Sequence, residues 1–198
     1  AALDTDPWFL VLVVIGLGLA TILLEQGARL ALLWVVMTLL ALAYLSRHPV
    51  RESLALADIG RGALIGLVAG GPFAIFVLRP LGTFSQRLYA TDDALLLFYQ
   101  ASIAAPLAEG LLFRGVLQPA KGIWWSAAAS ASMGLLYFAP HTPLLVTIIV
   151  CGVLFLLGVV CGHTRKQYGL GAGMACHAVA ALMLSVVPTM VSTWQTWL

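Results

Sequence analysis

Long apolar runs separated by short polar connectors dominate the sequence. A helix that crosses a membrane needs about 20 apolar residues to span roughly 30 Å of hydrocarbon, and it satisfies its own backbone hydrogen bonds there. Seven runs come near this length, at residues 8–25, 28–46, 62–79, 94–118, 124–140, 143–162 and 168–190. The pattern therefore predicts an all-α protein, a polytopic transmembrane helix bundle of about seven spans.

One connector differs from the others. Residues 51–61 are too polar to cross a membrane, yet they keep several apolar side chains, so we expect a short interfacial helix before the third span. The third span then carries Gly62, Gly66 and Gly70 at four-residue spacing. Small residues at this spacing let a neighbouring helix approach closely, which indicates a packing surface. We expect a single integral membrane domain over residues 1–198.

The composition supports a membrane protein and excludes other classes. Apolar residues make up 62% of the chain and charged residues 9%, and the mean hydropathy is +1.02. A soluble domain has roughly 25% charged residues. The net charge is only +2 and the basic residues are scattered, so no nucleic-acid partner is expected. Most basic connectors fall on the side of the N-terminus, which predicts a cytoplasmic N-terminus.

Few ionisable residues lie inside the predicted spans. Glu109 is the one acidic residue well inside a span, His141 ends the fifth span, and His177 lies within the seventh. Burying such groups in a membrane is costly, which favours a functional role.

The chemistry of these residues leaves three interpretations open. A carboxylate and two imidazoles can activate a water molecule, with Glu109 as the general base and the histidines orienting the water and stabilising an oxyanion. Glu109, His141 and His177 can also hold a divalent metal such as Zn²⁺, with one position open. In the third interpretation Glu109 only pairs with Arg114 or a neutral histidine and joins helices.

Three short segments resemble the motifs of one protein family. Residues 105–115 read APLAEGLLFRG, residues 137–141 read YFAPH, and residues 177–181 read HAVAA. They are similar to the three motifs of the CPBP family, the CAAX-protease and bacteriocin-processing (Abi) membrane proteins. These motifs are Glu-Glu-x-x-x-Arg, an aromatic residue four positions before a His, and His-x-x-x-Asn or Asp. The likeness covers about residues 57–185, which we take as the family-like core.

The resemblance implies a glutamate-dependent intramembrane endopeptidase, often classed with the metalloproteases. It implies that Glu109 activates water, His141 helps to hold it, His177 stabilises the oxyanion and Arg114 anchors the first motif helix. On the glutamate mechanism no cofactor is required, and a divalent metal on Glu109, His141 and His177 is the alternative. The implied substrate is an apolar or lipidated peptide, and the implied location is a bacterial-type inner membrane.

Two positions depart from the family pattern. Gly110 stands where the family has its second Glu, and Ala181 stands where it has Asn or Asp. Loss of one oxyanion donor typically lowers a rate by ~10²–10³-fold. We therefore carry a second hypothesis, in which the protein is a catalytically impaired relative that serves as a scaffold or accessory subunit of a membrane complex. A small transporter or proton relay built on Glu109 and the histidines is a third.

Overall fold

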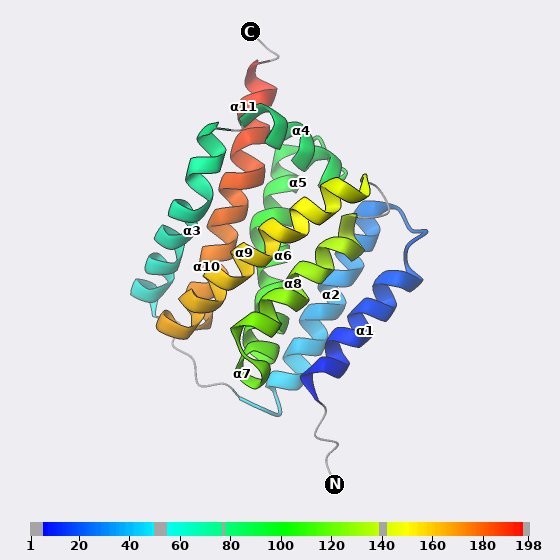
Figure 1. Cartoon of the computed structure of the whole chain (residues 1–198), viewed down its shortest axis with the longest axis vertical. Helices are drawn as coiled ribbons and strands as arrows, with labels where there is room; N and C mark the ends of the chain where they lie inside the picture. The colour runs from blue at the N-terminus through cyan, green and yellow to red at the C-terminus, as the bar shows by residue number, and fades with distance from the viewer. Residues whose placement is uncertain (1–5, 50–54, 77, 139–141, 196–198) are drawn as a thin grey trace.

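Helices make up nearly all of the chain in the computed structural model, which describes residues 6–49, 55–76, 78–138 and 142–195. The first half contains α1 (Pro7–Ala20), α2 (Gln26–Leu45), α3 (Leu56–Phe76), α4 (Leu78–Tyr89), α5 (Ala94–Phe98), the π-helix η1 (Tyr99–Ala104) and α6 (Ala105–Glu109). The second half contains the π-helix η2 (Gly110–Leu117), α7 (Gln118–Lys121), α8 (Ile123–Phe138), α9 (Leu144–Tyr168), α10 (Leu170–Ala181), the π-helix η3 (Leu182–Val186) and α11 (Val187–Gln195). The helices lie side by side, and the N-terminus and C-terminus are at opposite ends of the bundle (Figure 1).

The predicted all-α membrane bundle is confirmed, with a difference in the length of two spans. Among the described residues, five helices are long and apolar enough to cross a membrane: Gln26–Leu45, Leu56–Ile75, Ala94–Lys121, Leu144–Tyr168 and Leu170–Ser192. The first predicted span is the shorter apolar helix α1, which has 14 residues. The fifth is α8, a continuous helix of 16 residues that contains three serines, and these serines lower its mean hydropathy. The protein is therefore an integral membrane protein with helices of unequal length.

The predicted interfacial helix over residues 51–61 is not a separate element in its described part. Residues 56–61 are instead the first turns of α3, and residues 50–54 lie outside the described residues. Asp58 favours a helix start here because its charge complements the positive end of the helix, and its carboxylate pairs with Arg61 at 2.9 Å. The polar segment thus extends a membrane helix.

Helix α4 occupies a connector between two predicted spans. It packs beside α11 at the end of the bundle that carries the C-terminus (Figure 1). Leu81, Phe84 and Leu88 alternate with polar residues at helical spacing, which gives the helix one apolar face. The buried side chain of Gln26 donates to the backbone carbonyl of Leu88 and so ties α2 to this helix.

Three π-helical segments interrupt the helices that carry the first and third motifs. η2 directly follows Glu109, and η3 directly follows α10, the helix of His177. Such wide turns are rare and occur often at functional sites. In η2 the Phe113 carbonyl accepts the Gln118 N–H and also the Ser126 hydroxyl, at 2.7 Å. The wide turn after Glu109 is thereby fixed to α8.

The glycine stripe of α3 lies against the backbone of α10, as predicted. A Cβ atom added at Gly62, Gly66 or Gly70 would lie closer to the carbonyl oxygen of Ala172, Cys176 or Ala180, respectively, than carbon and oxygen can approach. Only residues without a side chain permit this approach. The stripe therefore sets the position of the helix that carries His177.

Gly66→Ala is expected to destabilise the protein by about 1–3 kcal/mol, because the new methyl group must push α10 away from α3. Gly60→Ala in the same helix meets no atom within 4 Å and is the matched control. It should stabilise α3 by up to about 1 kcal/mol through helix propensity. Thermal unfolding of both variants in detergent measures the effect, and equal shifts in Tm would contradict the backbone contact.

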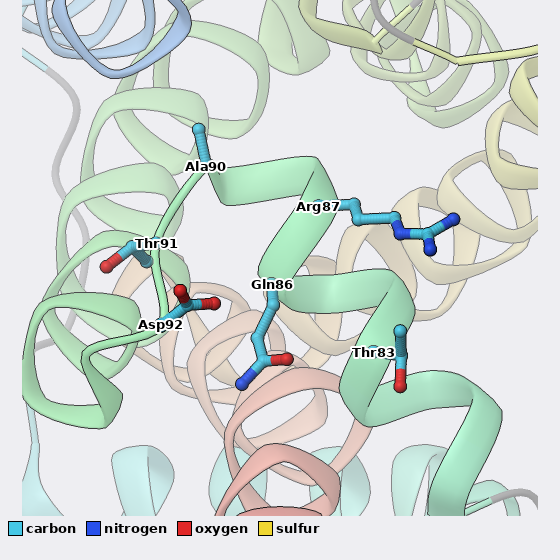
Figure 2. A pocket seen from close by; sticks show the side chains of 6 residues that line it. All are labelled: Thr83, Gln86, Arg87, Ala90, Thr91 and Asp92. Carbon is cyan, nitrogen blue, oxygen red and sulfur yellow. The ribbon is translucent and has the colours of Figure 1, made fainter.

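A strained residue ends α4. Ala90 has φ of 50°, in the left-handed region that disfavours residues with a Cβ. It borders a polar cleft of about 350 Å³ that is lined by Thr83, Gln86, Arg87, Thr91 and Asp92 (Figure 2). Glycine is the usual residue at such a helix end.

Ala90→Gly is expected to raise the free energy of unfolding by about 1 kcal/mol, because it removes the left-handed strain at the end of α4. Ala43→Gly, at an exposed position inside α2, is the control and should lower stability by a similar amount. Chemical denaturation in mixed micelles compares the two. A loss of stability in both variants would argue against strain at Ala90.

Candidate active site

Glu109 is a buried carboxylate at the end of α6. Its side chain is only 5% exposed, and the Ser130 hydroxyl of α8 donates to Oε2 at 3.4 Å. Tyr137, which lies two helical turns after Ser130, also places its hydroxyl beside the carboxylate. That hydroxyl donates to Sδ of Met37 at 3.3 Å. Neutral hydroxyl groups therefore surround Glu109 on the side of α8.

Arg114 and His177 form a second buried polar contact. Nη1 of Arg114, in η2, lies 3.2 Å from Nδ1 of His177, in α10. Arg114 is 2% exposed and His177 is 5% exposed. The charge of Arg114 acts on both Glu109 and His177. The first and third motifs thus meet at Arg114.

The described residues provide no ion pair for Glu109. In the part of the chain that the structure describes, no hydrogen bond or ion pair joins Glu109 directly to Arg114 or His177. The described geometry therefore gives no direct pairing of Glu109 with Arg114 or His177, and a pairing with His141 lies outside the described residues. A carboxylate without a bound cation keeps its lone pairs available to accept a proton from water.

His141 lies outside the described residues. Tyr137, the aromatic residue of the second motif, is buried in α8 and reaches Glu109, so this motif contributes to the site up to the end of the helix. The position of His141 beside Glu109 stays a prediction.

The two departures from the family pattern have different surroundings. A Cβ atom at Gly110 would lie 2.5 Å from Cγ of Met174, so Met174 fills the space that a second glutamate would need. Ala181 lies one turn after His177 on the same face of α10 and borders a cavity. The thioether side chain of Met174 thus fills the space at Gly110, whereas the space beside Ala181 remains open as part of the cavity.

The cavity beside His177 has a volume of about 250 Å³ and lies between α4, α9 and the end of α10. Its wall is largely apolar, with Ser85, Tyr89, Ser185 and His177 as the polar contributors. A second hollow of about 480 Å³ shares Leu81, Val153, Leu157 and Leu184 with the first and extends toward α3. His177 therefore borders a cavity that suits a hydrocarbon group and has only a few polar groups in its wall.

Two observations on the described residues bear on the predicted metal centre. The described residues contain no cluster of three or more His, Cys, Asp or Glu side chains that could hold a metal ion. Nδ1 of His177 also faces the guanidinium of Arg114, and a fixed cation next to a ligand opposes the binding of a second cation. The predicted ligand set Glu109, His141 and His177 depends on His141, which is outside the described residues.

Comparison with protein families identifies the segment that carries these residues. Residues 91–183 match the family described as Type II CAAX prenyl endopeptidase Rce1-like. This match agrees with the CAAX-protease resemblance of the three motifs. The matched residues include all three motifs and the helices that hold Glu109, Arg114 and His177, so the predicted resemblance is confirmed for this segment. Comparison with curated proteins and with solved structures gives no significant match.

The matched segment, residues 91–183, also contains contacts that sequence motifs alone did not indicate. Ser130 hydrogen-bonds Glu109, Ser126 binds the wide turn after it, and Met174 covers Gly110. Ser126 and Ser130 lie four residues apart on one face of α8, so a polar stripe was readable there. Met174 carries no such signal, because a methionine in an apolar helix is ordinarily a core residue.

Proposed function

We propose that the protein is an intramembrane endopeptidase in which Glu109 activates water to hydrolyse a peptide bond. The observation that carries this proposal is the buried carboxylate of Glu109, which has no ion pair with any described residue. It lies near a buried Arg114–His177 contact, and His177 borders an apolar cavity. Burying ionisable side chains in a membrane protein lowers its stability, and such residues are found mainly where they act in catalysis or transport.

The proposed reaction uses the residues in fixed roles. Glu109 takes a proton from water as the oxygen attacks the carbonyl carbon, and His177 donates a hydrogen bond to the oxyanion that forms. Glu109 then returns the proton to the amide nitrogen as the C–N bond breaks, which yields one carboxyl and one amino terminus. His141 would orient the same water, and Arg114 would hold the segment that follows Glu109.

The cavity favours an apolar or lipidated peptide as the substrate. Hydrocarbon groups gain free energy when they leave water or bind in an apolar pocket, and the wall beside His177 offers mainly such surface. We place the protein in a bacterial-type inner membrane with a cytoplasmic N-terminus. If Glu109 activates water without a metal, a metal chelator should leave the rate of hydrolysis unchanged. If a zinc ion activates the water, the chelator should abolish hydrolysis.

A scaffold or accessory subunit of a membrane complex is the second candidate function. The replacement of the second glutamate by Gly110, with Met174 in its space, and the presence of Ala181 support it. Both departures remove polar groups from the site.

Hydrolysis by the purified protein separates the two functions. The full chain is reconstituted in vesicles with a fluorogenic peptide that carries an apolar segment, with and without a chelator. Cleavage by the protein alone, unchanged by the chelator, supports the endopeptidase. Absence of cleavage together with stoichiometric co-purification of another membrane protein would favour the scaffold.

A further inference from the structure

We infer that Arg114 is a positioning residue that holds His177 with its ring proton on Nε2, so that the ring presents a fixed N–H donor to the cavity. This inference deepens the proposed function and rests on it for its catalytic consequence. The hydrogen-bond geometry itself does not depend on activity.

The contact between the two side chains determines the tautomer. A guanidinium has only N–H donors and keeps its proton in proteins, so Nδ1 of His177 accepts the hydrogen bond from Nη1 at 3.2 Å. A neutral imidazole that accepts at Nδ1 carries its proton on Nε2. A doubly protonated ring would set a second N–H and a second positive charge against Arg114 in a buried site.

The absence of a side chain at Gly110 explains why Arg114 is available to His177. Positions 110 and 114 both lie in the wide turn η2, four residues apart, so a glutamate at 110 would be near enough to pair with the arginine. Met174 occupies that space instead. Nε of Arg114 has no hydrogen-bond partner among the described residues, and the contact with His177 is the one side-chain hydrogen bond that they give its guanidinium.

His177 borders the cavity, and we infer that Nε2, the ring nitrogen that Arg114 does not contact, is the one that points toward it. The described residues provide no hydrogen-bond partner for Nε2, and His177 borders the apolar cavity together with Ala181. A neutral N–H donor in apolar surroundings gains most from a carbonyl oxygen or from the oxyanion that a carbonyl becomes. We therefore assign His177 to binding the carbonyl oxygen of the substrate, with Nδ1 closed to proton transfer.

Nitrogen NMR of ¹⁵N-histidine-labelled protein tests this assignment. The chain has four histidines, and His177→Gln identifies the signal of His177 by its loss. The wild-type ring should show an unprotonated Nδ1 and a protonated Nε2. Arg114→Met should convert this signature to a mixture of tautomers, and Arg114→Lys, which retains a donor, should restore most of it.

Two results would overturn the assignment: a protonated Nδ1 in the wild type, or an unchanged signature in Arg114→Met. Kinetics adds the catalytic consequence, because Arg114→Met should lower kcat more than it changes KM. If the expected tautomer is found in a protein that hydrolyses nothing, the proposed function fails and the role of Arg114 as a positioning residue is supported. If the protein hydrolyses peptides and Nδ1 is protonated, the proposed function holds and the inference fails.

Discussion

Glu109→Gln is expected to lower the rate of peptide hydrolysis by about 10²–10⁴-fold. The amide keeps the shape of the side chain and the contact with Ser130, but it cannot take a proton from water. The substitution therefore separates chemistry from packing at a buried position. Initial rates with the fluorogenic peptide in vesicles give the loss, and thermal unfolding shows whether the variant remains folded.

Glu25→Gln is the matched control for this loss. Glu25 is the N-cap of α2, where its carboxylate accepts the N–H groups of Gly27 and Ala28 at 3.1 and 3.3 Å. The same change of acid to amide there should alter stability slightly and leave the rate within about twofold, since this residue lies at the surface. Equal activity of Glu109→Gln and the wild type would remove Glu109 from the reaction.

Ala181→Asn is expected to raise the rate of hydrolysis, by up to about 10²–10³-fold. Positions 177 and 181 lie on the same face of α10, and both border the cavity, so an amide at 181 would add a second donor beside Nε2 of His177. The cavity of about 250 Å³ has room for the larger side chain. The effect should appear in kcat, because the new hydrogen bond forms mainly with the oxyanion.

Ala178→Asn provides the comparison for this gain. It introduces the same side chain into the same helix at a residue that borders neither of the two hollows described above. A neighbour of His177 on a helix points about 100° away from it and so cannot share its donor direction. A gain in both variants, or in neither, would contradict the place given to Ala181 beside the oxyanion.

The sequence predicts the class of fold well because membrane crossing imposes long apolar segments. The glycine stripe of α3 was also predictable, since residues spaced by four share one helix face and glycine allows backbone contact. The length of α1 and of α8 was less predictable. Short helices satisfy the same apolar pattern when they are packed among longer ones, and hydropathy does not report packing.

The contacts among the candidate site residues differ from those that the sequence suggested. Glu109, Arg114 and His177 were expected, and the structure joins Arg114 to His177 where the sequence offered Glu109 as a partner of Arg114. The π-helical turn after Glu109 changes which side chains meet by one position, and no propensity marks such a turn in an apolar helix. The space that Met174 fills is likewise a property of packing between helices.

The most direct test of the central claim is hydrolysis in ¹⁸O-enriched water by purified wild-type protein and Glu109→Gln, with the products analysed by mass spectrometry. We predict two fragments from the wild type, with one ¹⁸O atom in the new carboxyl group, and almost none from Glu109→Gln. Intact peptide after incubation with the wild type, or equal amounts of labelled fragments from both proteins, would contradict the account.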